Sequence, residues 1–250
     1  MDGFEKHGIG HLSASSINLW SNAPDVWVMQ YLFGKRTGMG PAPWRGICVE
    51  DAVVETLLGG SEADAIQTAL DKFDTRFFLG DEKTSKERAM IEPMVHLAVE
   101  ELMEFGKPEF PEDEKGQEKI SITAKGNGWQ IPVIGYLDLV YPQHGTVIDI
   151  KTTGRAPSNM SAEHKLQRAI YAKAKGNFAV KFLYITPKKA VMLEDGDVAE
   201  TLAQAKVQIG RMEAFLRTLD KEQAKEIVPL QPGSFYWNGS EDLRKEFYGI

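Results

Sequence analysis

Two strand patterns followed by a helix pattern constrain the fold more than any other part of this sequence. Gly135–Val140 has the composition of a strand and contains a single acid, and Thr146–Thr152 has that of a second, more apolar strand. The bridge Tyr141–Gly145 contains a proline and a glycine, which predicts a turn and therefore a hairpin. A helix is predicted over Ala162–Lys175, and Gly176 is expected to end it.

Charged residues within this hairpin predict a metal site. Strand residues two apart share a face, so Asp149 and Lys151 point to one side while Ile148 and Ile150 point into a core. Asp138 on the neighbouring strand can then lie alongside Asp149, and two acids that close repel each other unless a cation lies between them. Oxygen ligands suit Mg²⁺ or Mn²⁺, and a nearby lysine can orient or deprotonate a water, or stabilise charge on a phosphate. The alternative is a surface hairpin that simply carries two acids and a lysine.

The predicted helix adds Gln167 and Tyr171, which are four residues apart and so share one helix face. Three motifs in this order resemble those of the PD-(D/E)xK nuclease superfamily, most of all its RecB-like and phage-type exonuclease branch: Gly135-x-x-Asp138, Asp149-Ile150-Lys151 and Gln167-x-x-x-Tyr171. By that resemblance, Gln167 and Tyr171 are accessory residues that lie beside the site and contact DNA.

The resemblance also implies roles for the two strands. Asp138 and Asp149 are expected to be metal ligands, with the main-chain carbonyl of Ile150 as a third. Lys151 is expected to be the catalytic lysine that serves the attacking water. The implied cofactor is Mg²⁺, with Mn²⁺ as a substitute.

The N-terminal region contributes further candidates. In the RecB-like branch a glycine is followed four residues on by a histidine that completes the metal site, whereas here Gly46 is followed by Glu50, as in phage exonucleases related to the lambda enzyme. Glu50 is therefore expected to be an additional ligand; the alternative is an exposed helical glutamate. Ser13 is a natural helix N-cap, and its surroundings resemble the Leu-Ser-x-Ser entry of RecB-like nucleases. Arg45 either holds a phosphate or is an ordinary surface arginine.

The distribution of charge is more informative than the net charge of −7, which does not by itself indicate a DNA-binding protein. Lys151–Lys189 contains nine basic residues and one acid, and Glu92–Glu118 contains nine acids and two lysines. The basic segment coincides with the motifs and includes Arg155, Lys165 and Arg168, which we expect to contact DNA. A polyanion can be bound locally on such a surface while the far side repels it. The alternative is the ordinary charge bias of segments of this length.

We expect an α/β protein with a restriction-endonuclease-like core, in which a mixed central β-sheet is flanked by helices and preceded by a helical N-terminal region. Residues 1–250 are expected to form a single nuclease domain: a mainly helical part over 1–110, the catalytic sheet and motif helix over 117–195, and a C-terminal helix and tail over 196–250. A hydrophobic content of 42% is ordinary for such a domain.

No membrane segment is expected, because no apolar run approaches the roughly 20 residues of a membrane span. The N-terminus lacks an apolar signal region. The single cysteine, Cys48, excludes an internal disulfide and fits a reducing cytoplasm, which would be that of the host if the chain is phage-encoded.

Two structural expectations concern other segments. A helix is predicted over Thr84–Gly106 with a kink at Pro93. The aromatic cluster Phe235–Trp237 is expected to be exposed and to stack on bases, or else to dock onto the domain as a closing lid.

These observations predict a divalent-metal-dependent enzyme, and the resemblance implies a DNA exonuclease that acts in phage-type DNA recombination, repair or degradation. Its expected partners are DNA and a single-strand annealing or recombination protein, and the resemblance allows a homo-oligomeric ring around DNA. The alternatives are a structure-specific endonuclease, a catalytically weak DNA-binding or recombination-accessory protein on the same fold, and a carboxylate enzyme acting on a small phosphorylated substrate. The set Asp138, Asp149 and Lys151 argues against the binding protein, and the basic segment argues against the small substrate.

Overall fold

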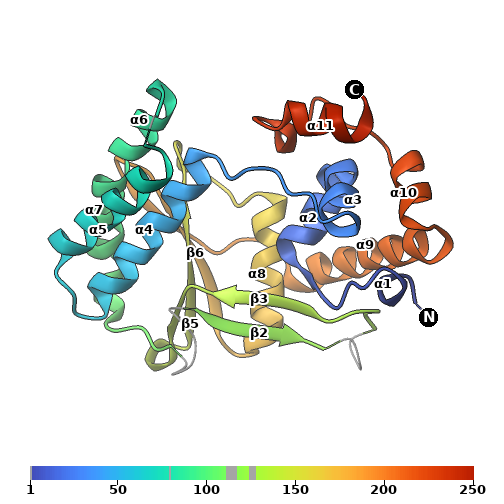
Figure 1. The fold of residues 1–250 in the computed structure, drawn as a ribbon. Helices are drawn as coiled ribbons and strands as arrows, with labels where there is room; N and C mark the ends of the chain where they lie inside the picture. Colours follow the sequence, from blue (N-terminus) through green and yellow to red (C-terminus); the bar gives the residue numbers. More distant parts are fainter. Residues whose placement is uncertain (1, 79, 111–116, 124–127) are drawn as a thin grey trace.

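Two small mixed β-sheets form the framework of the computed structural model, which describes residues 2–78, 80–110, 117–123 and 128–250 (Figure 1). The first sheet has the order β1-β3-β2: Leu12–Ser13, Val133–Leu137 and Glu118–Ile122. The second has the order β4-β5-β6-β7: Leu139–Tyr141, Thr146–Thr152, Ala179–Ile185 and Ala190–Leu193. The α/β class and the flanking helices are as predicted. The described strands are divided between two sheets rather than forming the one central sheet that we expected.

The division between the sheets occurs at Asp138. β3 pairs with β1 and β2, whereas β4 pairs antiparallel with β5 from Leu139 opposite Ile148 onward. The predicted strand Gly135–Val140 is therefore two strands, and Asp138 lies at the junction between them. The predicted hairpin is confirmed for β4 and β5, which are joined by a 3₁₀ turn and by Gly145 at a φ of 54°.

Strand β5 lies inside its sheet, between β4 and β6, and is buried from Thr146 to Ile150. It runs parallel to β6, and a parallel pair requires a crossover connection. Helix α8 (Ala162–Lys175) supplies that connection over the predicted residues, with Ser161 capping its start and Gly176 ending it at a φ of 64°. The two faces of β5 are as predicted: Val147 packs in one hydrophobic core, and Ile148 packs in the other.

Helices lie at both ends of the molecule and on both sides of the second sheet (Figure 1). The N-terminal helices are α1 to α7: Gly3–Lys6, Ala14–Asn22, Pro24–Leu32, Pro41–Leu57, Glu62–Arg76, Glu82–Ala89 and Ile91–Leu102. A 3₁₀ turn, η1 (Met103–Phe105), follows α7. The expected helix with a kink at Pro93 was wrong, because the helix breaks at Met90. Pro93 lies in the first turn of α7, where the N–H that proline lacks has no helical partner. No described helix has the length and apolar character needed to cross a membrane.

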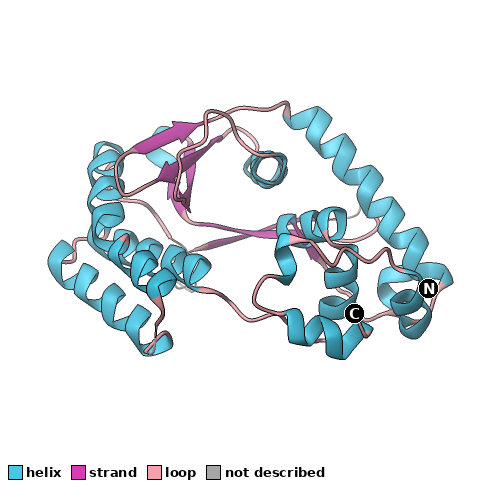
Figure 2. Cartoon of the chain, turned by 90° about the horizontal axis from the view of Figure 1, so that it is seen from above, coloured by secondary structure: helices cyan, strands magenta, loops and turns pink. Residues whose placement is uncertain are grey.

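The C-terminal segment wraps back onto α2 and α3, so both termini lie at the same end of the molecule (Figure 2), away from α4–α7 (Figure 1). Its elements are α9 (Val198–Thr218), α10 (Lys221–Ile227), η3 (Phe235–Trp237) and α11 (Glu241–Tyr248). Buried Asp25 anchors the segment, since its Oδ2 accepts hydrogen bonds from the indole Nε1 of Trp237 (3.0 Å) and the backbone N of Gln231 (2.9 Å). The aromatic cluster is thus docked onto the domain through Trp237, while Phe235 is 78% exposed.

Candidate active site

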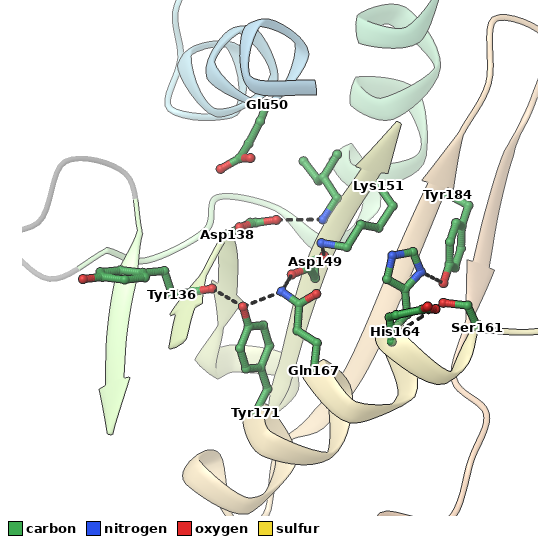
Figure 3. Close-up of polar contacts among 12 residues, drawn as sticks. Glu50, Tyr136, Asp138, Asp149, Lys151, Ser161, His164, Gln167, Tyr171 and Tyr184 are labelled. Atoms are coloured by element: carbon green, nitrogen blue, oxygen red, sulfur yellow. Dashed lines mark hydrogen bonds and ion pairs between the residues drawn. The ribbon is translucent and has the colours of Figure 1, made fainter. Parts of the chain in front are cut away.

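One cavity of about 750 Å³ gathers most of the residues singled out in the sequence. Asp138 comes from the junction of β3 and β4, Asp149 and Lys151 from β5, and Glu50 from α4 (Figure 3). The remaining candidates that line it are Ser13, Ile150, Gln167 and Tyr171. Residues from α4, from the strands and from α8, which are separated in sequence, therefore meet in one place.

Helix α4 carries Glu50 to the site because it approaches β5 closely at Gly46. A Cβ added at Gly46 would lie 3.2 Å from the side-chain oxygen of Thr152, a contact tighter than most real Cβ contacts. Glu50 lies four residues further along the helix, about one turn, and its carboxylate points toward Asp138 (Figure 3). Gly46 thus allows α4 to lie close to β5, and this close approach brings the carboxylate of Glu50 to the site.

Gln117, directly before β2, joins Glu50 to Asp138. Its Nε2 donates to Oε1 of Glu50 at 2.7 Å and to Oδ1 of Asp138 at 3.0 Å. The other oxygen of Asp138 accepts a hydrogen bond from the backbone N of Ile150 at 2.9 Å, so both oxygens of this buried carboxylate are held. Our sequence analysis missed Gln117, because nothing local distinguishes it from any polar residue at the start of a strand.

Asp149 is 1% exposed and is held by two neighbours. Its Oδ2 accepts a hydrogen bond from Nε2 of Gln167 at 3.0 Å, and its Oδ1 forms an ion pair with the ammonium of Lys151. The same Gln167 nitrogen donates to the hydroxyl of Tyr171 at 2.6 Å, and that hydroxyl donates to the main-chain carbonyl of Tyr136 at 2.6 Å (Figure 3). The two motif residues of α8 therefore tie Asp149 to β3.

Gly135 makes this connection sterically feasible. A Cβ added there would lie 2.6 Å from Cε1 of Tyr171. Tyr171 is 4% exposed, so its ring cannot move outward to make room. The glycine of the first motif is thus needed for the tyrosine of the third.

Burial and mutual repulsion perturb the pKa values of the three acids. Burial raises the pKa of Asp138 well above its ordinary value, and the charges of Asp149 and Glu50 raise it further. Burial also raises the pKa of Asp149, and together with the charge of Asp149 it raises the pKa of Glu50 to about 7. Burial alone would lower the pKa of Lys151, but the charges of Asp149 and Asp138 raise it above its ordinary value. Two buried acids and a half-buried one, when ionised beside a single ammonium, leave an excess of negative charge that a cation would relieve.

These acids supply oxygen ligands of the kind that Mg²⁺ prefers. Within the part of the chain that the structure describes, no three His, Cys, Asp or Glu side chains are close enough to hold an ion as they stand. The Gln117 amide lies between two of the acids and presents its N–H groups to both, as a cation would. The donor set therefore fits a divalent cation once this amide moves aside.

His164 and Tyr184 lie on the other side of Lys151 (Figure 3). The Nδ1 of His164 is 2.6 Å from the hydroxyl of Tyr184, which pairs in register with Lys151 across β5 and β6. Burial, reinforced by the charge of Lys151, lowers the pKa of His164 to about 4, so its imidazole is neutral at pH 7. Our sequence analysis missed His164, although it lies three residues before Gln167 on the same helix face.

The structure does not bring every expected DNA-contact residue into the cavity. Ser13 lines it, and its Oγ accepts a hydrogen bond from the backbone N of Ser16, which confirms the predicted N-cap. Arg45 is 4% exposed and pairs with Glu87, so both expectations for it were wrong: it is neither a surface arginine nor free to hold a phosphate.

The three basic residues that were expected to contact DNA do not line the active-site cavity. Lys165 pairs with Asp195 at 3.2 Å, and Arg168 donates to the main-chain carbonyl of Val180 at 2.9 Å. Arg155 is exposed and lines a neighbouring cavity of about 340 Å³ that shares Lys151 with the site. Positions 111–116 of the predicted acidic segment lie outside the described residues.

Comparisons with known proteins place the chain in a family. Among solved structures, a chain described as the crystal structure of SSO0001 is 18% identical with a TM-score of 0.34, covering 65% of this chain and 74% of that chain, which is too weak a likeness to support an argument. A comparison with curated proteins finds no match. The sequence model of the PD-(D/E)XK nuclease superfamily matches residues 11–235, which is most of the chain. The chain therefore belongs to the PD-(D/E)XK nuclease superfamily.

Proposed function

We propose that this chain is a divalent-metal-dependent DNA exonuclease of the phage type, which hydrolyses phosphodiester bonds. The observation that carries the proposal is the meeting of Glu50, Asp138 and Asp149 with Lys151 in one cavity. Nucleases of this superfamily typically use divalent metals such as Mg²⁺. The glutamate at position 50, where RecB-like members have histidine, supports the phage-type branch.

The three carboxylates and the main-chain carbonyl of Ile150 would hold the metal ion. When bound, Mg²⁺ neutralises charge on the scissile phosphate and favours ionisation of the attacking water. Gln167 orients Asp149 through the hydrogen bond at 3.0 Å, and Tyr171 orients Gln167 in turn. These two residues act through Asp149 rather than on the substrate.

Lys151 stabilises the negative charge that develops on the phosphate. A lysine side chain is ordinarily protonated at neutral pH and is then a poor base, and in the metal-free protein the neighbouring carboxylates raise the pKa of Lys151 further. Its ammonium is held beside Asp149 and can donate hydrogen bonds to a phosphoryl oxygen or to the attacking water. Of the two roles open to this lysine, charge stabilisation with positioning of water is therefore favoured over proton abstraction.

Linear and circular DNA distinguish the reaction types. End-labelled linear DNA and its covalently closed circle are incubated with Mg²⁺ or with EDTA, using the wild type and Lys151→Ala. Loss of the linear form alone, only in Mg²⁺ and only with the wild type, supports the exonuclease. Cutting of the circle would make the protein an endonuclease at the same site. Binding without cutting in Mg²⁺ or Mn²⁺ would favour the recombination-accessory protein.

A further inference from the structure

An exposed aromatic ring lies beside the proposed metal ligands. Tyr136 is two residues before Asp138 on β3, and its side chain is 46% exposed. Other large apolar side chains of the described residues are exposed to this degree, but Tyr136 is the one that lines the active-site cavity. Its ring extends from the strand away from the carboxylates (Figure 3). Ligand-binding cavities typically combine apolar and aromatic side chains with a few polar groups, as this one does, so an exposed aromatic ring here suits a ligand contact.

The backbone beneath this ring is rigid. β3 pairs with β2 along its length, and the carbonyl of Tyr136 accepts the hydrogen bond from buried Tyr171. That hydroxyl also accepts a hydrogen bond from Gln167, which holds Asp149. The backbone of Tyr136 and the carboxylate of Asp149 are thus held relative to each other through one chain of hydrogen bonds.

Other groups in the same cavity suit a nucleic acid strand. Tyr31 from α3 and Tyr236 from the C-terminal segment also line it, and the ring of Tyr31 stacks on Trp27 at a centroid distance of 5.0 Å. Arg36, which follows α3, is exposed and adds a positive charge to the lining. Aromatic rings interspersed with cations along a groove are typical of proteins that bind single strands, because each base can stack on a ring.

We propose that the DNA strand to be cut is bound unpaired, with one of its bases stacked on Tyr136. This inference rests on the proposed nuclease function. In a duplex both faces of each internal base are covered by neighbouring bases, so away from the end of the duplex a tyrosine ring can stack only on a base that has left the stack. Asp138 and Asp149 are only 6% and 1% exposed, so the scissile phosphate must enter the cavity to reach them.

Two measurements test the inference with the full chain. The first compares kcat/KM in Mg²⁺ for a single-stranded oligonucleotide and for the same strand annealed to its complement. The second places 2-aminopurine near the end of the single strand and records its fluorescence on binding in EDTA, where stacking on a tyrosine quenches it. Both use the wild type, Tyr136→Ala, Tyr136→Phe and the control Phe78→Ala, which removes a ring that is 84% exposed and lies outside this cavity.

We expect the single strand to be preferred, and Tyr136→Ala to lower kcat/KM on it about 5- to 150-fold, the range for loss of one stacked base. Tyr136→Phe and Phe78→Ala should behave as the wild type, and the quenching should be lost only in Tyr136→Ala. Equal cutting of duplex and single strand, unaffected by Tyr136→Ala, would overturn the inference and leave the nuclease function standing. If the wild type cuts neither form, the nuclease proposal fails, and the fluorescence alone decides: quenching lost in Tyr136→Ala supports base stacking, and no quenching overturns it.

Discussion

Replacing Asp149 by asparagine should abolish stabilisation of the fold by Mg²⁺ while the metal-free protein stays folded. Asparagine has nearly the same shape, and its side-chain oxygen can still accept the hydrogen bond that Gln167 donates at 3.0 Å. Burial raises the pKa of Asp149, so its charge is a cost to the metal-free fold. Lys151 keeps Asp138 as a neighbouring negative charge. The substitution therefore removes the charge of a metal ligand and its ion pair with Lys151 but keeps the hydrogen bond to Gln167, and calorimetry in EDTA checks that the variant is folded.

The size of the effect follows from mass action. A ligand that binds only the folded state at about 100 times its Kd adds about 2.7 kcal/mol to the free energy of unfolding. For a chain of 250 residues, 1 kcal/mol shifts the Tm by about 2–4 °C. Saturating Mg²⁺ should therefore raise the Tm of the wild type by about 5–11 °C and should not raise that of Asp149→Asn.

Differential scanning calorimetry across a Mg²⁺ titration, with EDTA as the reference, measures these shifts. Glu213→Gln is a matched control, because Glu213 is also buried but lies on α9 and outside the cavity. This control should keep the full response to Mg²⁺. An undiminished Mg²⁺ shift in Asp149→Asn, or no shift in the wild type, would refute the assignment of the metal site.

Three further predictions concern the same site. The pKa of Glu50 is about 7 in the folded protein and is expected near 4.5 when unfolded, so the metal-free protein should lose stability as pH rises between these values. Urea unfolding at pH 5 and pH 8 should show a smaller loss for Glu50→Gln. Gln117→Ala removes the amide between two carboxylates and should destabilise the metal-free protein by about 1–3 kcal/mol while tightening Mg²⁺ binding by isothermal titration calorimetry; unchanged affinity would contradict this. Gly135→Ala, whose new Cβ would meet the ring of Tyr171, should cost about 1–3 kcal/mol in thermal denaturation, whereas Gly154→Ala, in open space, should cost little.

Elements with local signals were predicted from the sequence. The bounds of α8 were predicted correctly because both ends have capping residues, Ser161 and Gly176, and its apolar residues recur at helical spacing. The alternation of Ile148 and Ile150 with Asp149 likewise predicted the two faces of β5. These signals depend only on neighbouring residues in the sequence, so they can be recognised without the tertiary structure.

Elements determined by distant contacts were not predicted. Nothing near Asp138 shows that its strand changes sheets there, since the change depends on which strands lie on either side. We predicted a kink at Pro93, whereas the helix breaks at Met90. Proline disrupts a helix interior but is tolerated in a first turn, and the sequence alone does not show which of these positions Pro93 occupies.

The candidate site shows the same limit. The motifs indicated its acids and lysine because their spacing along a strand and a helix is a local property. Gln117 escaped notice because its partners, Glu50 and Asp138, are remote in sequence. The expectation for Arg45 was wrong because the sequence shows its charge but not its ion pair with Glu87, which lies on another helix.

The most direct test of the metal-dependent nuclease centre is cleavage of end-labelled linear DNA by the wild type and by Asp138→Asn, in Mg²⁺ and in EDTA. Glu118→Gln serves as a control, because Glu118 pairs with Lys175 at 2.9 Å and does not line the cavity. We predict cutting by the wild type and the control in Mg²⁺ only, and a loss of at least about a hundredfold in Asp138→Asn. Cutting in EDTA, or undiminished cutting by folded Asp138→Asn, would contradict the proposed centre.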